Sequence, residues 1–251
     1  MPKFFVKQKQ IKEKTIEIKE EDVKHIRNVL RKDIDDEIEI CNIDNGNNYK
    51  CKIKQINKEN IICEIIGHIE SRAESKIYVD IYQGLPKADK MELIIQKSVE
   101  LGVYRIIPTN MKRCIVKIDA KEEYKKIERW QKISEVAAKQ CGRDIIPKVE
   151  NITSIKNISD NKQYDAIIVA YEEERENTLK YELTKLKNMK KEKYNIGIVI
   201  GPEGGIDKEE IETLKNSGAK IVTLGQRILR TETVALNILS IIMYELEESI
   251  I

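Results

Sequence analysis

Two glycine-bearing segments near the C-terminus have the residue types of a backbone that binds a ligand. The first reads Ile198-Val-Ile-Gly-Pro-Glu-Gly-Gly-Ile206, and the second reads Leu224-Gly-Gln-Arg-Ile-Leu-Arg-Thr-Glu-Thr233. Glycine tolerates backbone angles and close approach that other residues forbid, so such loops can present N–H and C=O groups to a ligand. A single loop of this kind is equally consistent with a tight strand-to-helix turn. Two of them indicate a ligand site more specifically.

An apolar strand should precede each loop and a helix should follow it. The runs at 166–170 and 196–200 are short and continuously apolar, which is typical of strands buried in a parallel sheet. Asp207 is a suitable N-cap for a helix over 207–216, directly after the first loop. Further strands are expected at 77–82, 104–108 and 221–224, and further helices at 89–101, 122–140 and 233–247. This alternation of strands and helices predicts an α/β domain with a parallel sheet.

The N-terminal part of the chain follows a different pattern. Polar and apolar residues alternate over 37–41 and again over 49–56, and an Asn/Gly-rich turn separates the two runs. Another apolar run, at 61–66, follows a second polar turn. A period of two residues interrupted by such turns predicts antiparallel strands. We therefore expect a small β-rich, barrel-like domain.

One helix is expected within this β-rich part, over 20–30, because Val23, Ile26, Val29 and Leu30 have helical spacing. The pattern then becomes polar around 67–76. We place the domain boundary there, which gives a β-rich domain over 1–72 and an α/β domain over 73–251.

The net charge says little about partners, because 45 Lys and Arg nearly balance 43 Asp and Glu. The distribution of charge says more. Residues 104–148 carry 12 Lys and Arg against 6 Asp and Glu, whereas residues 232–251 carry four Glu and no Lys or Arg. This asymmetry favours one face that meets phosphates and another that does not. A solvated helix face is the alternative explanation for any single lysine-rich helix.

Metal, disulfide and common nucleotide motifs are missing from the sequence. No pair of the five cysteines has C-x-x-C spacing, and there are only two histidines, so we predict no metal site. The scattered cysteines are typical of reduced thiols in a cytoplasmic protein. Neither G-x-G-x-x-G nor G-x-x-x-x-G-K-[ST] occurs. There is no secretory h-region and no apolar run long enough for a transmembrane helix, so a soluble, cytoplasmic protein is expected.

The two loops together resemble the cofactor loops of the SPOUT methyltransferases, the trefoil-knotted enzymes that modify RNA. Within that superfamily the chain most resembles the RsmE family, the 16S rRNA (uracil-N3)-methyltransferases. The resemblance extends to segments 25–31, 83–92, 94–102, 129–131 and 137–143, in the correct order. It implies a C-terminal SPOUT-type α/β trefoil-knot domain preceded by a PUA-like β-barrel. Gln226, Cys141 and Val234 depart from the residues common at these positions, which affects the shape of loops more than the assignment.

In these enzymes S-adenosylmethionine lies bent among three loops, held largely by backbone groups. The resemblance therefore assigns cofactor binding to the residues Gly201, Pro202, Glu203, Gly204, Gly205, Leu224, Gly225, Ile228, Leu229, Arg230 and Thr231. Leucine and isoleucine side chains would sandwich the adenine. Ordinary core packing is the alternative role for Ile228 and Leu229, and both roles can hold at once.

Uracil N3 carries a proton at neutral pH and is a poor nucleophile until that proton is removed or the resulting anion is stabilised. A carboxylate base can remove the proton, and a guanidinium can stabilise the anionic uracil electrostatically. Our hypothesis is that Glu232 is the base, or orients it, and that Arg230 binds an anion or a phosphate. The alternative is structural, because Arg230 and Glu232 could pair with one another or across a dimer interface.

The same resemblance implies 16S rRNA in the small ribosomal subunit as substrate and a homodimer as the assembly. The expected RNA-binding residues are His25, Arg27, Arg31, Lys112, Arg113, Arg129, Lys139 and Arg143. The closing helix, with Leu236, Leu239, Ile242 and Leu246, suits either a dimer interface or an internal core. Two other functions stay open: a SPOUT methyltransferase acting on tRNA, and a catalytically silent RNA-binding factor in ribosome assembly.

Overall fold

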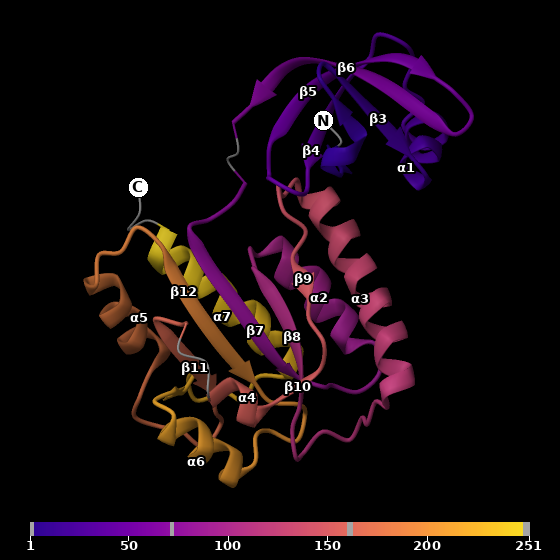
Figure 1. The fold of residues 1–251 in the computed structure, drawn as a ribbon. Helices are drawn as coiled ribbons and strands as arrows, with labels where there is room; N and C mark the ends of the chain where they lie inside the picture. The colour runs from indigo at the N-terminus through magenta and orange to yellow at the C-terminus, as the bar shows by residue number, and fades with distance from the viewer. Residues whose placement is uncertain (1–2, 71–72, 160–162, 248–251) are drawn as a thin grey trace. The chain divides into compact units, whose positions relative to one another are not determined.

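The chain folds into two compact units in the computed structural model, which describes residues 3–70, 73–159 and 163–247 (Figure 1). The first unit combines Met1–Glu74 with Ala138–Ile146, and the second combines Ser75–Ala137 with Pro147–Ile251. The first unit therefore contains a segment that returns to it from much later in the chain. Periodicity in the sequence does not reveal such a return, because it reports which face of an element is apolar and not what covers that face.

A mixed six-stranded sheet forms the first unit, in the order β1-β4-β5-β6-β3-β2. β1 pairs with β4 in parallel, and the remaining neighbours are antiparallel. The strands are β1 (Lys3–Val6), β2 (Ile11–Lys12), β3 (Thr15–Lys19), β4 (Glu37–Asn42), β5 (Asn48–Ile56) and β6 (Asn60–Ile69). The alternation in β5 buries Tyr49, Cys51 and Ile53 in the core, as the period of two predicts. Burial also raises the pKa of Cys51 to about 12, so this thiol stays protonated.

The helix of the first unit is shorter and more irregular than the sequence predicts. α1 (Glu21–Lys24) follows β3 and continues as a π-helical turn over His25–Val29. A separate short 3-10 turn lies earlier in the chain, at Gln8–Gln10. Val23 and Ile26 are buried as expected, but Val29 is 68% exposed. A π-helical turn holds more residues per turn than an α-helix, so residues late in it, such as Val29, leave the apolar face that a period of 3.6 predicts.

The second unit is built on a seven-stranded sheet whose pairings are all parallel. Its order is β10-β8-β7-β12-β11-β13, and β9 pairs with β8. The strands are β7 (Ile77–Gly84), β8 (Arg105–Asn110), β9 (Lys148–Val149), β10 (Thr153–Ser154), β11 (Ala166–Ala170), β12 (Tyr194–Ile200) and β13 (Lys220–Val222). β12 lies between β7 and β11, and Ile196, Ile198 and Val199 are fully buried in it. The continuous apolar run of β12 is thus confirmed as a buried parallel strand.

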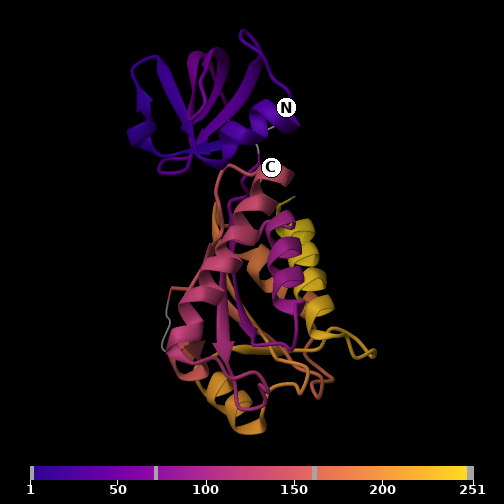
Figure 2. The same cartoon turned by 90° about the vertical axis from the view of Figure 1, so that its right-hand side faces the viewer.

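Helices cover this sheet. They are α2 (Lys90–Glu100), α3 (Ala120–Cys141), α4 (Ile155–Ser159), α5 (Leu179–Asn188), α6 (Lys208–Asn216) and α7 (Thr231–Glu247). α2 and α7 lie side by side, with α7 also against β7 and β12 (Figure 2). Asp207 caps α6 in a capping box with Glu210, which confirms the expected N-cap. Among the described residues, no helix has the length and apolar character needed to cross a bilayer.

Candidate cofactor site

Three loops come together at the carboxyl ends of β11, β12 and β13. In the sheet register, Ala170 at the end of β11 lies opposite Ile200 of β12 and opposite Val222 of β13. Because the strands are parallel, the segments that follow them all leave the same edge of the sheet. The loops after Ala170, Ile200 and Val222 are therefore neighbours, although they are far apart in sequence.

The loop over 201–205 is fixed by close backbone contacts. A Cβ on Gly201 would lie 2.9 Å from the carbonyl carbon of Gly205 and 2.9 Å from Cγ1 of Ile206. Gly205 has a φ of +71°, and a Cβ there would lie 2.1 Å from a carboxylate oxygen of Glu172. The loop also meets β7, because a Cβ on Gly84 would lie 2.6 Å from Cδ of Pro202. Gly84 and Gly201 are thus needed for the close packing of backbone, and Gly205 is favoured by its positive φ.

A buried hydrogen-bond chain joins this loop to the start of α7. The Thr231 hydroxyl donates to the carbonyl oxygen of Gly201 at 2.7 Å, and it accepts from Nε2 of Gln83 at 2.9 Å. The same Gln83 nitrogen donates to the carbonyl oxygen of Gly84 at 3.0 Å. Since Gln83 and Thr231 are both buried, this chain fixes the end of β7, the loop and the helix relative to one another.

The loop over 224–230 is much more open. Gly225 has a φ of +112°, and nothing lies within 4 Å of the position a Cβ would take there. Its backbone N–H is held only locally, by Oγ1 of Thr223 at 3.2 Å. Ile228 is 83% exposed, which rules out core packing as its role in this structure. An isoleucine with so much apolar surface in water is suited to being covered by a ligand.

Together the three loops enclose a pocket of about 480 Å³. All the residues that the sequence assigns to cofactor binding line it, together with Ala170 at the end of β11 and Tyr171, Glu172 and Arg175 from the loop after it. Its volume lies within the range of about 300–1,000 Å³ that is usual for small-molecule sites. Apolar side chains, backbone groups and charged side chains all face this space, a combination suited to a ligand with an apolar ring and a charged end.

Three charged groups cluster at one wall of the pocket, and two of them, Lys90 and Glu203, line it. Nζ of Lys90, a lining residue, lies 2.9 Å from Oε1 of Glu203 and 3.5 Å from Oε2 of Glu232. The side chain of Glu232 is 17% exposed, and its Oε2 makes no hydrogen bond with the described residues. Glu232 therefore pairs with Lys90, and it makes no ion pair with Arg230 within the described part of the chain.

The electrostatics of this wall follow from these contacts. Burial tends to raise the pKa of Glu203, but hydrogen bonds from Lys90 and from the backbone N–H groups of Glu203 and Lys87 outweigh it, so this pKa lies below its ordinary value. The hydrogen bond to Glu203 raises the pKa of Lys90. Both groups are consequently charged near neutral pH.

Comparison with known proteins identifies the family. Residues 73–243 match a domain family, the RNA methyltransferase domain. Residues 18–66 match a second one, the RNA methyltransferase PUA domain. The ribosomal RNA small subunit methyltransferase E of Bacillus subtilis is 38% identical over 98% of this chain and 98% of its own. The chain belongs to the ribosomal RNA small subunit methyltransferase E family. The Aquifex aeolicus member is 32% identical over 90% of this chain and 93% of its own.

A solved structure of this family confirms the predicted class of fold. The methyltransferase E of Neisseria gonorrhoeae, bound to S-adenosyl methionine, superposes with a TM-score of 0.83 at 28% identity, covering 97% of each chain. The family thus combines a small PUA-like domain with an α/β domain of the SPOUT type built on a parallel sheet, as the resemblance implied. In this methyltransferase E family member, the glycine-loop pocket lies entirely within the α/β unit.

The basic residues that were expected to bind RNA are spread over both units. In the second unit, Arg113 donates to the carbonyl oxygen of Gly204 at 3.1 Å, which places it beside the first loop. Lys112 pairs with Glu209 at the start of α6, and Arg129 pairs with Glu92 at 2.6 Å. The first unit holds the others: His25, Arg27 and Arg31 are exposed around the π-helical turn, and Lys139 pairs with Asp22 at 3.0 Å.

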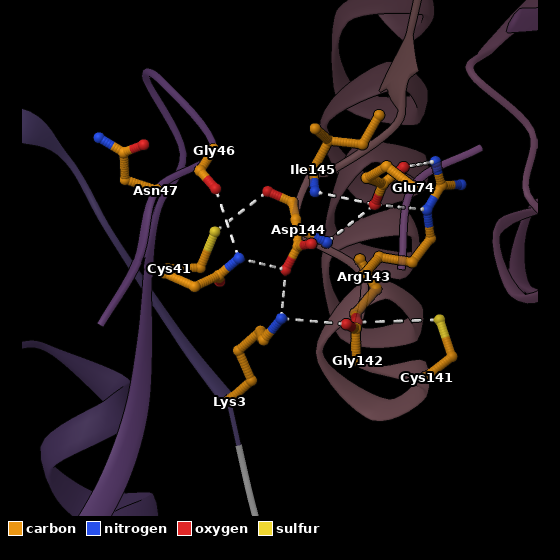
Figure 3. Close-up of polar contacts among 12 residues, drawn as sticks. Lys3, Cys41, Gly46, Asn47, Glu74, Cys141, Gly142, Arg143, Asp144 and Ile145 are labelled. Atoms are coloured by element: carbon orange, nitrogen blue, oxygen red, sulfur yellow. Dashed lines mark hydrogen bonds and ion pairs between the residues drawn. The ribbon is translucent and has the colours of Figure 1, made fainter. Parts of the chain in front are cut away.

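Arg143 is the exception, because its guanidinium is used inside the first unit (Figure 3). Nη2 and Nε of Arg143 donate to the carboxylate of Glu74 at 2.6 and 3.2 Å, and Arg143 is only 6% exposed. Glu74 also accepts from the backbone N–H groups of Asp144 and Ile145. Contact with RNA through this side chain would require the ion pair with Glu74 to break. In this structure the Arg143 guanidinium therefore holds the first unit together and is not free to bind RNA.

Several pocket residues were missed at the sequence level, and for those that follow β11 a signal was present. Tyr171, Glu172 and Arg175 directly follow the apolar run of β11, which was expected to be a buried parallel strand. The rule that ligands bind at the carboxyl ends of parallel strands would have found them. Lys90 lies in segment 83–92, which carried part of the resemblance, but no local pattern indicates that it reaches two distant carboxylates.

Proposed function

We propose that this protein uses S-adenosylmethionine to methylate N3 of a specific uridine in the 16S rRNA of the small ribosomal subunit. The observation that carries the proposal is the convergence of three loops, with every cofactor-binding residue expected from the sequence, on one pocket. The family membership supports the same activity, and the Neisseria gonorrhoeae relative binds S-adenosyl methionine.

The residues of the pocket suit this cofactor. Leu224, Ile228 and Leu229 offer apolar side chains for an adenine ring, and the exposed state of Ile228 leaves its surface available. Gly201, Gly204 and Gly225 leave backbone N–H and C=O groups accessible to polar atoms. When bound, S-adenosylmethionine supplies an electrophilic methyl group on a positively charged sulfur. The carboxylates of Glu172 and Glu203, which line the pocket, suit such a cation.

Glu232 is the residue we propose to receive the N3 proton of the target uracil. It lies at the start of α7, directly after Thr231, whose hydroxyl is fixed to the first loop. Its Oε2 is buried and lies 3.5 Å from Nζ of Lys90, and the side chain is 17% exposed, so the exposed part of the carboxylate is the proton acceptor that we propose. General-base catalysis requires an acceptor within hydrogen-bond reach of the proton that it removes.

The mouth of the pocket suits an RNA backbone. Arg175, Arg227 and Arg230 line it from two loops, and none of the three guanidiniums makes an ion pair with any residue in the described ranges. Arg113 lies beside the first loop. We propose that these arginines hold phosphates near the target base, with His25, Arg27, Arg31, Lys112, Arg129 and Lys139 as outlying contacts. Affinity for RNA should therefore fall steeply as salt rises.

A homodimer in the cytoplasm completes the proposal. Leu239, Ile242 and Leu246 of α7 are fully buried within the single chain, so a core role accounts for them. Leu93 of α2 and Tyr244 of α7 are exposed on two helices that pack together, and they are the candidates for a contact with a second copy. Light scattering of the purified protein, with Tyr244→Lys as the variant, tests this contact.

The activity is tested by incubating the protein with labelled S-adenosylmethionine and small subunits that lack the modification, and then mapping the methyl group. Label on N3 of one 16S uridine is the expected result. Label on tRNA alone would favour another SPOUT methyltransferase, and cofactor binding without transfer would favour a silent assembly factor. Each of these outcomes contradicts the proposal.

The role of Glu232 is tested separately. We expect Glu232→Gln to bind cofactor normally while the rate of transfer falls by about 10²- to 10⁴-fold, the usual contribution of a general base. A near-normal rate with intact cofactor binding would eliminate Glu232 as the base.

A further inference from the structure

Lys90 occupies an unusual position for a lysine at the start of a surface helix. It is the first residue of α2 and lines the pocket, and its side chain is 28% exposed. Its ammonium contacts two carboxylates that come from different loops, Glu203 at 2.9 Å and Glu232 at 3.5 Å. Three segments distant in sequence are therefore needed to place this one positive charge.

Glu203 is itself held in place from the side of α2. Its carboxylate accepts from the backbone N–H of Lys87 at 3.1 Å as well as from Lys90. The ammonium of Lys90 is thus restrained at the wall of the pocket before any ligand arrives. The guanidiniums of Arg175 and Arg227 also line the pocket, but no ion pair with a described residue restrains them. A charge that is fixed in advance stabilises a developing charge without first having to be ordered.

The proposed reaction moves a negative charge near this ammonium. When the N3–H bond of uracil breaks, its proton passes to Glu232 and its electron pair stays on the base. The negative charge of the carboxylate therefore disappears and a negative charge appears on the uracil ring. That electron pair then forms the N3–methyl bond, while the electron pair of the broken S–C bond stays on sulfur. A cation that faces Glu232 can attract the charge both before and after the proton moves.

We propose that Lys90 is a further catalytic residue, whose ammonium stabilises the N3-deprotonated uracil while Glu203 holds it at the pocket. This rests on the proposed function, because it concerns the same site and the same base. A structural role, in which Lys90 only ties α2 to the two loops, is the alternative. The two roles differ in what they do to the acidity of the bound uracil.

The test measures that acidity without turnover. The probe is a 16S rRNA fragment with 5-fluorouridine at the mapped nucleotide, bound in the presence of S-adenosylhomocysteine, and the ¹⁹F resonance reports ionisation of N3. In the wild-type protein we expect N3 to titrate about one pH unit lower than in free RNA. In Lys90→Met the titration should return towards that of free RNA, whereas Lys90→Arg should keep most of the shift.

Lys97→Met is the matched control, because Lys97 lies on the same helix and, among the described residues, pairs only with Glu100, at 2.8 Å. It should titrate like the wild type. The proposal would be overturned if Lys90→Met titrated like the wild type. It would also be overturned if the wild-type complex titrated like free RNA, a result that does not depend on the folding of any variant. Failure of the proposed function would look different, because the wild-type protein would then transfer no methyl group to the rRNA.

Discussion

The two loops of the pocket both contain glycine but differ in how tightly the protein packs around them. In the loop over 201–205, the backbone of Gly205 and Ile206 crowds Gly201, the carboxylate of Glu172 crowds Gly205, and the Thr231 hydroxyl donates to the carbonyl of Gly201. In the loop over 224–230, Gly225 has open space around it and Ile228 stands in solvent. The first loop is shaped by contacts within the protein, whereas the second presents exposed apolar surface that a ligand can cover.

This difference shows that glycine in a ligand loop can serve two purposes. At Gly201 it allows neighbouring backbone to approach, and at Gly225 it allows a left-handed backbone in a loop with few contacts. We infer that the first loop contributes a preformed surface to cofactor binding, and that the second contributes contact area that becomes ordered on binding.

The largest effect is expected from Gly201→Ala. The added Cβ would lie 2.9 Å from backbone of Gly205 and 3.1 Å from the nitrogen of Ile206, and backbone cannot move away as a flexible side chain can. Overpacking of this kind costs about 1–3 kcal/mol of stability, and we expect at least a roughly tenfold loss of cofactor affinity as well. Urea denaturation and calorimetric titration with S-adenosylhomocysteine measure the two effects.

Gly225→Ala is the matched control for this substitution. Its new Cβ meets nothing within 4 Å, so the only penalty is the positive φ of +112°. We expect a cost of about 1 kcal/mol, because the open loop can relax. If both alanine variants lost the same stability and affinity, the distinction between the loops would be wrong.

A smaller effect, confined to binding, is expected from Ile228→Ala. Because Ile228 is 83% exposed, its truncation should change the free energy of unfolding by no more than about 0.5 kcal/mol. Cofactor affinity should fall about tenfold, since each buried methylene contributes about 0.8 kcal/mol. Calorimetric titration and thermal melting separate these outcomes. A destabilised variant with unchanged affinity would show that the loop is part of the core.

The smallest effect is expected from Glu203→Gln, and it depends on pH. The pKa of Glu203 in the folded protein lies below its ordinary value of 4.5, so the ionised carboxylate stabilises the fold above that pH. This contribution is lost as the pH falls through the lowered pKa of the folded state. For a partly exposed pair we expect it to be below about 1 kcal/mol.

The measurement is urea denaturation of the wild type and of Glu203→Gln at neutral pH and at a pH below 4.5. The wild type should be the more stable protein at neutral pH, and the difference should shrink in acid. A difference that grows on acidification would contradict the sign of this linkage.

Regular elements of the second unit could be predicted from sequence because their signals are local. The apolar runs of β11 and β12 and the cap at Asp207 depend on neighbouring residues only, and all three are confirmed. α5 was missed although Leu179, Leu183 and Leu186 have helical spacing and are buried. The two-residue strands β9 and β10 are too short to carry a periodic pattern.

The site was predictable only where it is continuous in sequence. Both glycine loops were found, because each is one short segment. The cluster of Lys90, Glu203 and Glu232 was not, because its members come from three segments that only the folded sheet brings together. The internal use of Arg143 was hidden for the same reason, since its partner is Glu74.

The return of Ala138–Ile146 to the first unit constrains how the protein is made. Asp144 accepts from the buried side chain of Asn48 at 2.7 Å and pairs with Lys3, and its backbone oxygen accepts from the thiol of Cys41 at 3.1 Å. A nascent chain that ends before Asp144 lacks these acceptors, so its buried amide and thiol are left unsatisfied. Domains that fold during translation usually do so from the N-terminus onward. We therefore expect the N-terminal unit to reach its full stability only after residues 138–146 have emerged from the ribosome.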